Sequence, residues 1–322
     1  MWYNIYPIRQ GGCTIETPSG PAPRTVGGLG RWTRLRLEPA GRLIALGPAW
    51  AVLCGAVASG RLGGDGRDLL TLLLALLLAE PLLGGLWRVI VESPWEAWAA
   101  AAPIGDQDLA LPPLPYTAPG SPSARLTAWL SALLAHFRTA SGAQLAQAVG
   151  ELVGLAILAL AVAIMLGWQI VALLLVALAI AVVQAIGQRR GWLGTTVWPA
   201  IFDLGLAWLI GEGIFRELSL PGSGASLAVA GLYTIAYAGG IALTRGAPRR
   251  GLAAFAGAQG LVVALLIALQ RPLYAGALGL LLVPPLLLAP WLNRTSAGGA
   301  WLLQRTQLFW LLGMLVAALA IR

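Results

Sequence analysis

The chain of 322 residues is 58% hydrophobic and only 11% charged, contains 41 glycines and has a mean hydropathy of +0.78. This composition excludes a soluble globular protein and predicts a polytopic membrane protein. All 21 basic side chains are arginines, and the formal net charge is +8. Arginines that lie between apolar segments act as topological signals, so we expect the lipid bilayer as a partner and no nucleic acid.

Nine apolar segments have the length of roughly 20 residues that a membrane-spanning helix needs. We expect these helices at about 43–60, 69–91, 150–167, 169–187, 195–215, 225–244, 250–269, 272–291 and 305–321. Residues 1–40 form a polar, flexible tail in this interpretation, and residues 41–322 form the transmembrane domain. The links at Gly167-Trp168 and at 270–272 are so short that the helices on either side of each are expected to be antiparallel neighbours.

The distribution of arginines predicts the orientation of the bundle. With the N-terminus in the cytoplasm, all the arginines except five fall on the cytoplasmic side, as the positive-inside rule requires. The five exceptions are Arg61, Arg67, Arg216, Arg271 and Arg322. We therefore expect an integral protein of a bacterial-type inner (cytoplasmic) membrane.

The longest connection, residues 92–149, lies on the cytoplasmic side in this topology. Its first part is rich in proline, and its second part, LTAWLSALLAHFR at 126–138, has apolar residues at helical spacing. This pattern predicts a cytoplasmic loop followed by an amphipathic helix on the membrane surface. The two cysteines, Cys13 and Cys54, lie far apart in the chain and indicate neither a disulfide framework nor a metal site.

Short motifs recur in a fixed order along the apolar segments. Pro81-Leu82-Leu83 and Gly85 lie in the second segment, Gly191-Trp192-Leu193-Gly194 precedes the fifth, and residues 237–242, Tyr-Ala-Gly-Gly-Ile-Ala, lie in the sixth. With nine spans, these motifs resemble the UbiA superfamily of intramembrane prenyltransferases, most closely its chlorophyll and bacteriochlorophyll synthase branch. The resemblance implies an all-α membrane protein with a nine-helix UbiA-type bundle and a cytoplasmic N-terminus.

The resemblance also implies two aspartate-rich motifs that hold Mg²⁺ against a prenyl diphosphate, whose departure the metal assists. At the first motif this chain reads VESPWEAWA over residues 91–99, where Glu92 stands for the first aspartate and Glu96 lies one residue from the second. At the second motif, residues 243–250 read LTRGAPRR, without a carboxylate. We predict no metal site, and Glu92 and Glu96 are the catalytic candidates if the chain is active.

Three carboxylates, Glu80, Asp203 and Glu212, fall inside expected spans, where an ionisable side chain indicates a functional or partner-binding role. Asp203 and Glu212 are about 13.5 Å apart along one helix, too far to share a metal ion. Bundle contacts are the alternative explanation for the carboxylates, interfacial anchoring for the tryptophans and topological signals for the arginines. The candidate ligand-binding residues are Glu80, Trp87, Arg88, Arg189, Trp192, Asp203, Trp208 and Glu212.

Two functions fit these observations. The first is a catalytically degenerate relative of chlorophyll synthase that binds a pigment or isoprenoid (a chlorin, a carotenoid or a quinone). It would act as an accessory subunit beside other membrane subunits of a larger, photosynthetic complex. The second is an active Mg²⁺-dependent prenyltransferase that attaches a prenyl chain to a chlorin or another ring acceptor.

Overall fold

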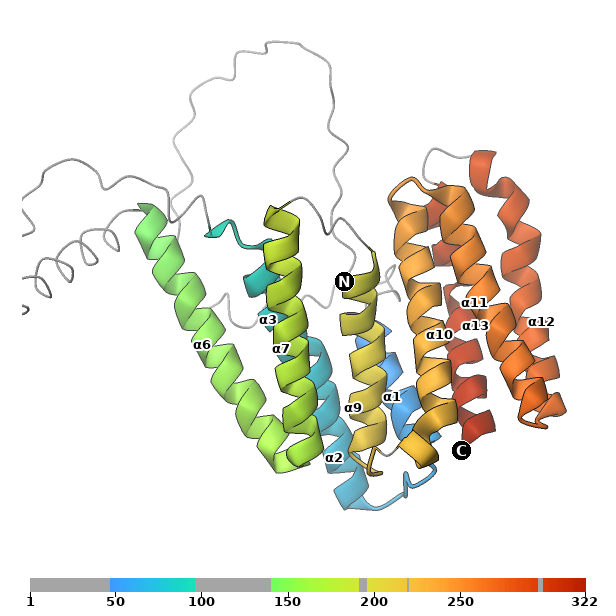
Figure 1. Ribbon diagram of the computed structural model, residues 1–322, viewed down its shortest axis with the longest axis horizontal. Coiled ribbons are helices and arrows are strands. Elements are labelled where there is room, and N and C mark those ends of the chain that lie inside the picture. The colour runs from blue at the N-terminus through green and yellow to red at the C-terminus, as the bar shows by residue number, and fades with distance from the viewer. Residues whose placement is uncertain (1–46, 96–139, 191–195, 219, 295–297) are drawn as a thin grey trace, which may run out of the picture.

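The computed structural model of the chain describes residues 47–95, 140–190, 196–218, 220–294 and 298–322. Within these ranges every regular element is a helix, and no strand occurs (Figure 1). The expected all-α class is therefore confirmed for this part of the chain. The expected amphipathic helix at 126–138 lies outside the described residues.

The helices follow the expected order along the chain. The first half contains α1 (Gly47–Ala58), α2 (Gly66–Leu77), η3 (Leu78–Leu83), α3 (Gly84–Trp87), η4 (Arg88–Glu92), α6 (Ala140–Leu166) and α7 (Trp168–Arg189). The second half contains α8 (Val197–Ala200), η5 (Ile201–Leu206), α9 (Ala207–Gly213), α10 (Leu220–Thr244), α11 (Pro248–Ala268), α12 (Pro272–Leu288), η6 (Ala289–Arg294) and α13 (Gly298–Ile321). Two continuous helices, 66–92 and 197–213, are thus built from several segments.

Within the described ranges, seven helices are long and apolar enough to cross a membrane: Gly66–Glu92, Gln144–Leu166, Trp168–Arg189, Ser223–Thr244, Pro248–Ala268, Pro272–Leu292 and Gly299–Ile321. The apolar helix α1 and the segment 197–213 are shorter. Each expected span overlaps a helix in the described ranges, so seven are confirmed by length and composition. The count of nine spans and the orientation stay predictions. The third span begins earlier than expected, since α6 already starts at Ala140.

The helices stand side by side in a broad, shallow row (Figure 1). The helices α6 and α7 lie at one side of the row, α1 and α9 lie in the middle, and α10 to α13 lie at the other side. Gly167, with φ of 118°, links α6 to α7, and Gln270, with φ of 61°, lies in the turn between α11 and α12. The two short links thus join antiparallel neighbours, as the sequence predicts.

Glycines set the closest approaches between helices on the α10 side. A Cβ atom on Gly239 of α10 would lie 2.7 Å from the carbonyl oxygen of Gly251, and one on Gly251 of α11 would lie 2.8 Å from that of Gly239. A Cβ on Gly299 of α13 would lie 2.2 Å from the carbonyl oxygen of Leu243. Small residues let membrane helices approach through their backbones, where dispersion contacts stabilise the pair. These glycines fix α11 and α13 against α10, which carries a side chain of the candidate site.

Candidate functional site

Three carboxylates of the two composite helices lie in π-helical segments. Glu80 lies in η3, Glu92 ends η4 and Asp203 lies in η5. Pro81 explains η3 in part, because proline has no N–H to donate to the preceding turn. Short π-helical segments are rare and occur frequently at functional sites. The π-helical segments therefore indicate a candidate site on the helices 66–92 and 197–213.

Trp87, the last residue of α3, contacts Phe202 of η5 through the two aromatic rings. The ring centroids of Trp87 and Phe202 are 4.5 Å apart, with planes inclined by 43°. The carboxylate of Asp203, the next residue after Phe202, accepts at Oδ2 a long hydrogen bond of 3.4 Å from the hydroxyl of Tyr237 on α10, and the Glu92 carboxylate acts on it electrostatically. We call Glu92 and Asp203 the carboxylate pair. The sequence did not predict it, because the two residues lie on separate helices and in separate motifs.

The carboxylate pair alone does not make a metal site. No group of three or more His, Cys, Asp or Glu side chains that could hold a metal ion occurs among the residues that the structure describes. Mg²⁺ needs six oxygen ligands and is commonly bound through one or two carboxylates together with substrate phosphates and water. The carboxylate pair could supply at most two of these six ligands, and phosphate oxygens and water would have to supply the others. Glu96, the other catalytic candidate, lies outside the described residues.

A second polar cluster joins α9 to α10. The Ser226 hydroxyl donates to Oε2 of Glu212 over 2.5 Å, and the indole N–H of Trp208 donates to the Ser226 oxygen over 3.0 Å. Glu212 is fully buried, and its Oε1 has no hydrogen-bond partner within the described part of the chain. Trp208 and Glu212, which the sequence proposed independently as ligand-binding residues, are thus brought together by Ser226. We call these three residues the Glu212 cluster.

The remaining candidates differ in how exposed they are. Trp87 is buried against Phe202, whereas Glu80, Arg88 and Arg189 are exposed on the described surface. Trp192 lies outside the described ranges. The structure therefore collects Trp87 and Asp203 at one place and Trp208 and Glu212 at another. A ligand-binding role for the eight residues stays a prediction.

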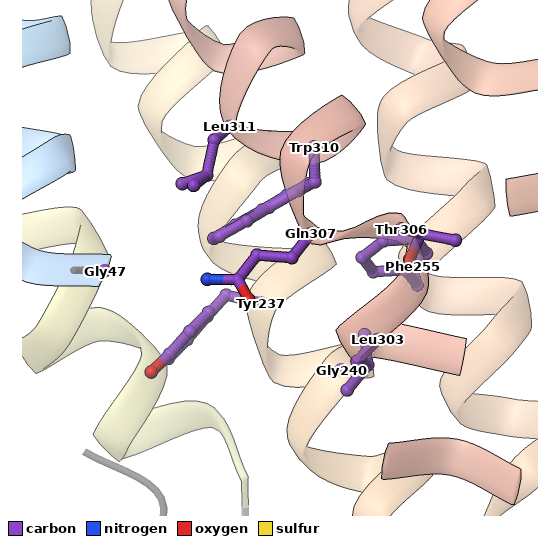
Figure 2. Close-up of a pocket in the computed structure, with 9 residues that line it drawn as sticks. All are labelled: Gly47, Tyr237, Gly240, Phe255, Leu303, Thr306, Gln307, Trp310 and Leu311. Carbon is purple, nitrogen blue, oxygen red and sulfur yellow. The ribbon is translucent and has the colours of Figure 1, made fainter. Parts of the chain in front are cut away.

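A pocket that none of the eight candidates lines lies between α1, α10, α11 and α13. Its cavity volume is about 30 Å³, and its walls include Gly47, Tyr237, Gly240, Phe255, Gln307 and Trp310 (Figure 2). Tyr237 connects this pocket to the carboxylate pair through its bond to Asp203. The one sequence signal for the pocket was the Tyr-Ala-Gly-Gly motif at 237–240, which supplies two of its walls.

The fold and these sites define the class of the protein: an all-helical integral membrane protein with carboxylates inside its helical bundle. The chain is similar to the bacteriochlorophyll synthase 34 kDa chain of Chloroflexus aurantiacus, with 31% identity over 188 residues. The similar region covers 58% of this chain and 50% of the relative, so the chain spans about half the length of this relative. No family model matches the chain, and no solved structure matches it. The resemblance to the chlorophyll and bacteriochlorophyll synthase branch of the UbiA superfamily is confirmed by this similarity.

Proposed function

We propose that the protein is a catalytically degenerate, chlorophyll-synthase-like membrane protein that binds a pigment or an isoprenoid. In this role it serves as an accessory subunit of a larger photosynthetic complex in the inner membrane. The observation that carries the proposal is the loss of carboxylates at the two positions where the resembled family binds Mg²⁺. Among the described residues, the first keeps Glu92, with Asp203 on another helix as its one carboxylate partner, and the second contains no carboxylate in its sequence.

The second position has the wrong charge for metal binding. It corresponds to the turn between α10 and α11, where Arg245, Arg249 and Arg250 are exposed and the first turn of α11 contains no acidic residue. Metal-assisted loss of diphosphate needs cations held against the developing negative charge by protein carboxylates. Three guanidinium groups repel a divalent cation instead. The turn thus supports a loss of the metal-dependent reaction.

The outer faces of the bundle support an embedded protein with room for neighbours. On α6, Ile157, Ile164 and Met165 are 62–74% exposed, and on α12, Leu273 and Leu280 are 74–86% exposed. Such side chains are buried from water only when lipid or another membrane subunit covers them. We therefore expect lipid over part of this surface and partner subunits over the rest.

The carboxylate pair favours a second candidate function, an active prenyltransferase. Glu92 and Asp203 would contribute two carboxylates to one Mg²⁺, with phosphate oxygens of a prenyl diphosphate completing the coordination. Mg²⁺, when bound, would neutralise the charge of the leaving diphosphate. Within this candidate, Tyr237 holds the Asp203 carboxylate in place, and the Trp87–Phe202 contact keeps the end of α3 against η5.

Prenyl transfer by the purified protein separates the two functions. The assay combines Mg²⁺, a labelled C20 prenyl diphosphate and a chlorophyllide-type acceptor, with an authentic synthase as the positive control. We expect no turnover from the folded protein, together with a pigment or isoprenoid that copurifies from native membranes and is identified by absorption and mass spectrometry. Turnover that Glu92→Gln or Asp203→Asn abolishes, while the distant exposed Glu217→Gln does not, would establish the enzyme instead.

A further inference from the structure

The indole N–H of Trp310 is a buried donor without an acceptor among the residues that the structure describes. The side chain is only 8% exposed, lines the pocket between α1, α10, α11 and α13, and its Nε1 has no hydrogen-bond partner in the described ranges. Buried polar groups are nearly always paired, because an unpaired one loses its water without compensation. By contrast, the nearby Trp50 indole donates to the backbone oxygen of Leu311 over 2.9 Å. The unpaired donor of Trp310 therefore points to an acceptor that enters the pocket from outside the protein.

The other walls of the pocket select a neutral, flat molecule. The rings of Tyr237 and Trp310 are nearly parallel, inclined by 18° with centroids 5.9 Å apart, and Phe255 of α11 adds a third aromatic side chain. The described lining contains no charged side chain, and the Thr306 hydroxyl is already used by the backbone oxygen of Leu302. Aromatic walls favour a conjugated ring by stacking, and the absence of charge disfavours a phosphate or carboxylate.

We infer that this pocket binds the ketone-bearing edge of a neutral conjugated molecule, with the Trp310 indole N–H donating to the ketone oxygen. This inference rests on the proposed function as a pigment- or isoprenoid-binding protein and assigns the binding residues. Quinones and chlorins with a ring ketone share the required chemistry. The ligand lies against the Tyr237 ring, on the side of α10 that also carries the bond to Asp203.

The size of the pocket determines how much of the ligand enters it. A cavity of about 30 Å³ holds the equivalent of one or two water molecules, which matches a ketone oxygen and the adjoining ring edge. The Gln307 side chain extends between the Trp310 and Tyr237 side chains in the close-up (Figure 2). Because it rotates about three single bonds, its displacement can enlarge the space at a modest entropic cost. Gly47 and Gly240 leave the opposite walls without side chains.

Two variants and one control test the assignment in the full-length protein in detergent. Trp310→Phe keeps an aromatic side chain but removes the N–H donor together with one of the two indole rings, and an apolar probe without an acceptor measures the effect of the lost surface. Gly240→Ala adds a methyl group to the wall, and its Cβ would lie at an ordinary contact distance of 3.5 Å from Leu303. Trp168→Phe changes an indole that is 77% exposed at the opposite end of the bundle. The probes are a short-chain prenylated quinone, a metal-free chlorin with a ring ketone, and phytane, which has no acceptor.

Equilibrium binding and the infrared ketone stretch of the bound probe are measured for each protein. We expect Trp310→Phe to weaken binding of the ketone probe by roughly three- to tenfold, to raise its ketone stretching frequency and to weaken phytane binding less than ketone binding. Gly240→Ala should weaken the same probe, and Trp168→Phe should have no effect. The probe that responds to the variants in this way, the quinone or the chlorin, identifies the class of ligand that the pocket binds.

Two results would overturn the inference and can be told apart from a failure of the proposed function. Equal binding and equal ketone frequency in Trp310→Phe and the unmodified protein would mean that the indole N–H meets only water. That result leaves pigment binding elsewhere intact. If the unmodified protein binds neither ketone probe, the inference fails, and the analysis of copurifying pigments decides the proposed function independently.

Discussion

Gly55 on α1 and Gly211 on α9 are the positions at which these two helices touch through their backbones. A Cβ on Gly55 would lie 2.0 Å from the carbonyl oxygen of Trp208, and one on Gly211 would lie 2.0 Å from that of Val52. Neither contact can be relieved by turning a flexible side chain, because the atom that is met belongs to the facing backbone. The middle of the bundle therefore depends on these two glycines.

We predict that Gly55→Ala and Gly211→Ala each destabilise the protein by about 1–3 kcal/mol, the usual cost of overfilling a packed interior. The control is Gly231→Ala on α10, where a new Cβ would meet nothing within 4 Å. There the higher helix propensity of alanine should be neutral or stabilising by up to about 1 kcal/mol. Thermal unfolding in detergent measures all three. Equal melting temperatures for Gly55→Ala and Gly231→Ala would show that α1 and α9 do not approach so closely.

We predict that removing the Ser226 hydroxyl from the Glu212 cluster lowers the free energy of unfolding. Ser226→Ala leaves the Trp208 indole N–H and one carboxylate oxygen of Glu212 without their partner in a buried place. Each buried group left unpaired costs about 1–3 kcal/mol. Thr71→Ala is the control, since its hydroxyl is exposed and donates only within its own helix.

A double-mutant cycle tests whether the cluster acts as a unit. Because Ser226 links Trp208 to Glu212, the effects of Ser226→Ala and Trp208→Phe on the free energy of unfolding should not add. We expect the double variant to lose less stability than the two single variants together. Strict additivity would mean that the two hydrogen bonds contribute independently or do not form.

Because the first metal-binding position is incomplete, we predict that Mg²⁺ does not stabilise the protein. In the proposed accessory role, millimolar Mg²⁺ with a non-hydrolysable prenyl diphosphate analogue should leave the melting temperature unchanged. A saturating ligand at about 100 times its Kd would add about 2.7 kcal/mol, which is readily detected. Differential scanning fluorimetry, with an authentic synthase alongside, makes the comparison. A Mg²⁺-dependent rise that Asp203→Asn removes would favour the active prenyltransferase.

The positions of the membrane helices could be predicted because hydropathy is a local property of the chain. The expected ends near 187, 244 and 269 agree with Arg189, Thr244 and Ala268 within a few residues. The start of α6 at Ala140 was missed, because residues 140–149 are polar enough to read as a loop although they continue the helix. Helix propensity extends a span beyond its apolar part, and hydropathy does not record it.

The site could be predicted only in part, because the sequence pattern of one segment does not show which residues of other helices it contacts. Asp203 and Glu212 were recognised as unusual, but their partners Tyr237 and Ser226 lie on α10 and carry no periodic signal. The pocket at Trp310 was missed for a related reason. An indole near the end of an expected span was explained as an interfacial anchor, and only the structure shows that its N–H has no acceptor among the described residues.

The distribution of arginines predicts which end of the bundle faces the cytoplasm. Helix α11 begins at Pro248, next to the exposed Arg249 and Arg250, and ends just before the exposed Arg271. At about 1.5 Å per residue its 21 residues cover roughly the 30 Å of the hydrocarbon core. In a variant with Cys13→Ser and Cys54→Ala, we introduce Arg250→Cys or Arg271→Cys and label intact spheroplasts with a membrane-impermeant maleimide. Arg271→Cys should be labelled at once, and Arg250→Cys only after permeabilisation; the reverse pattern would place the N-terminus of the bundle outside.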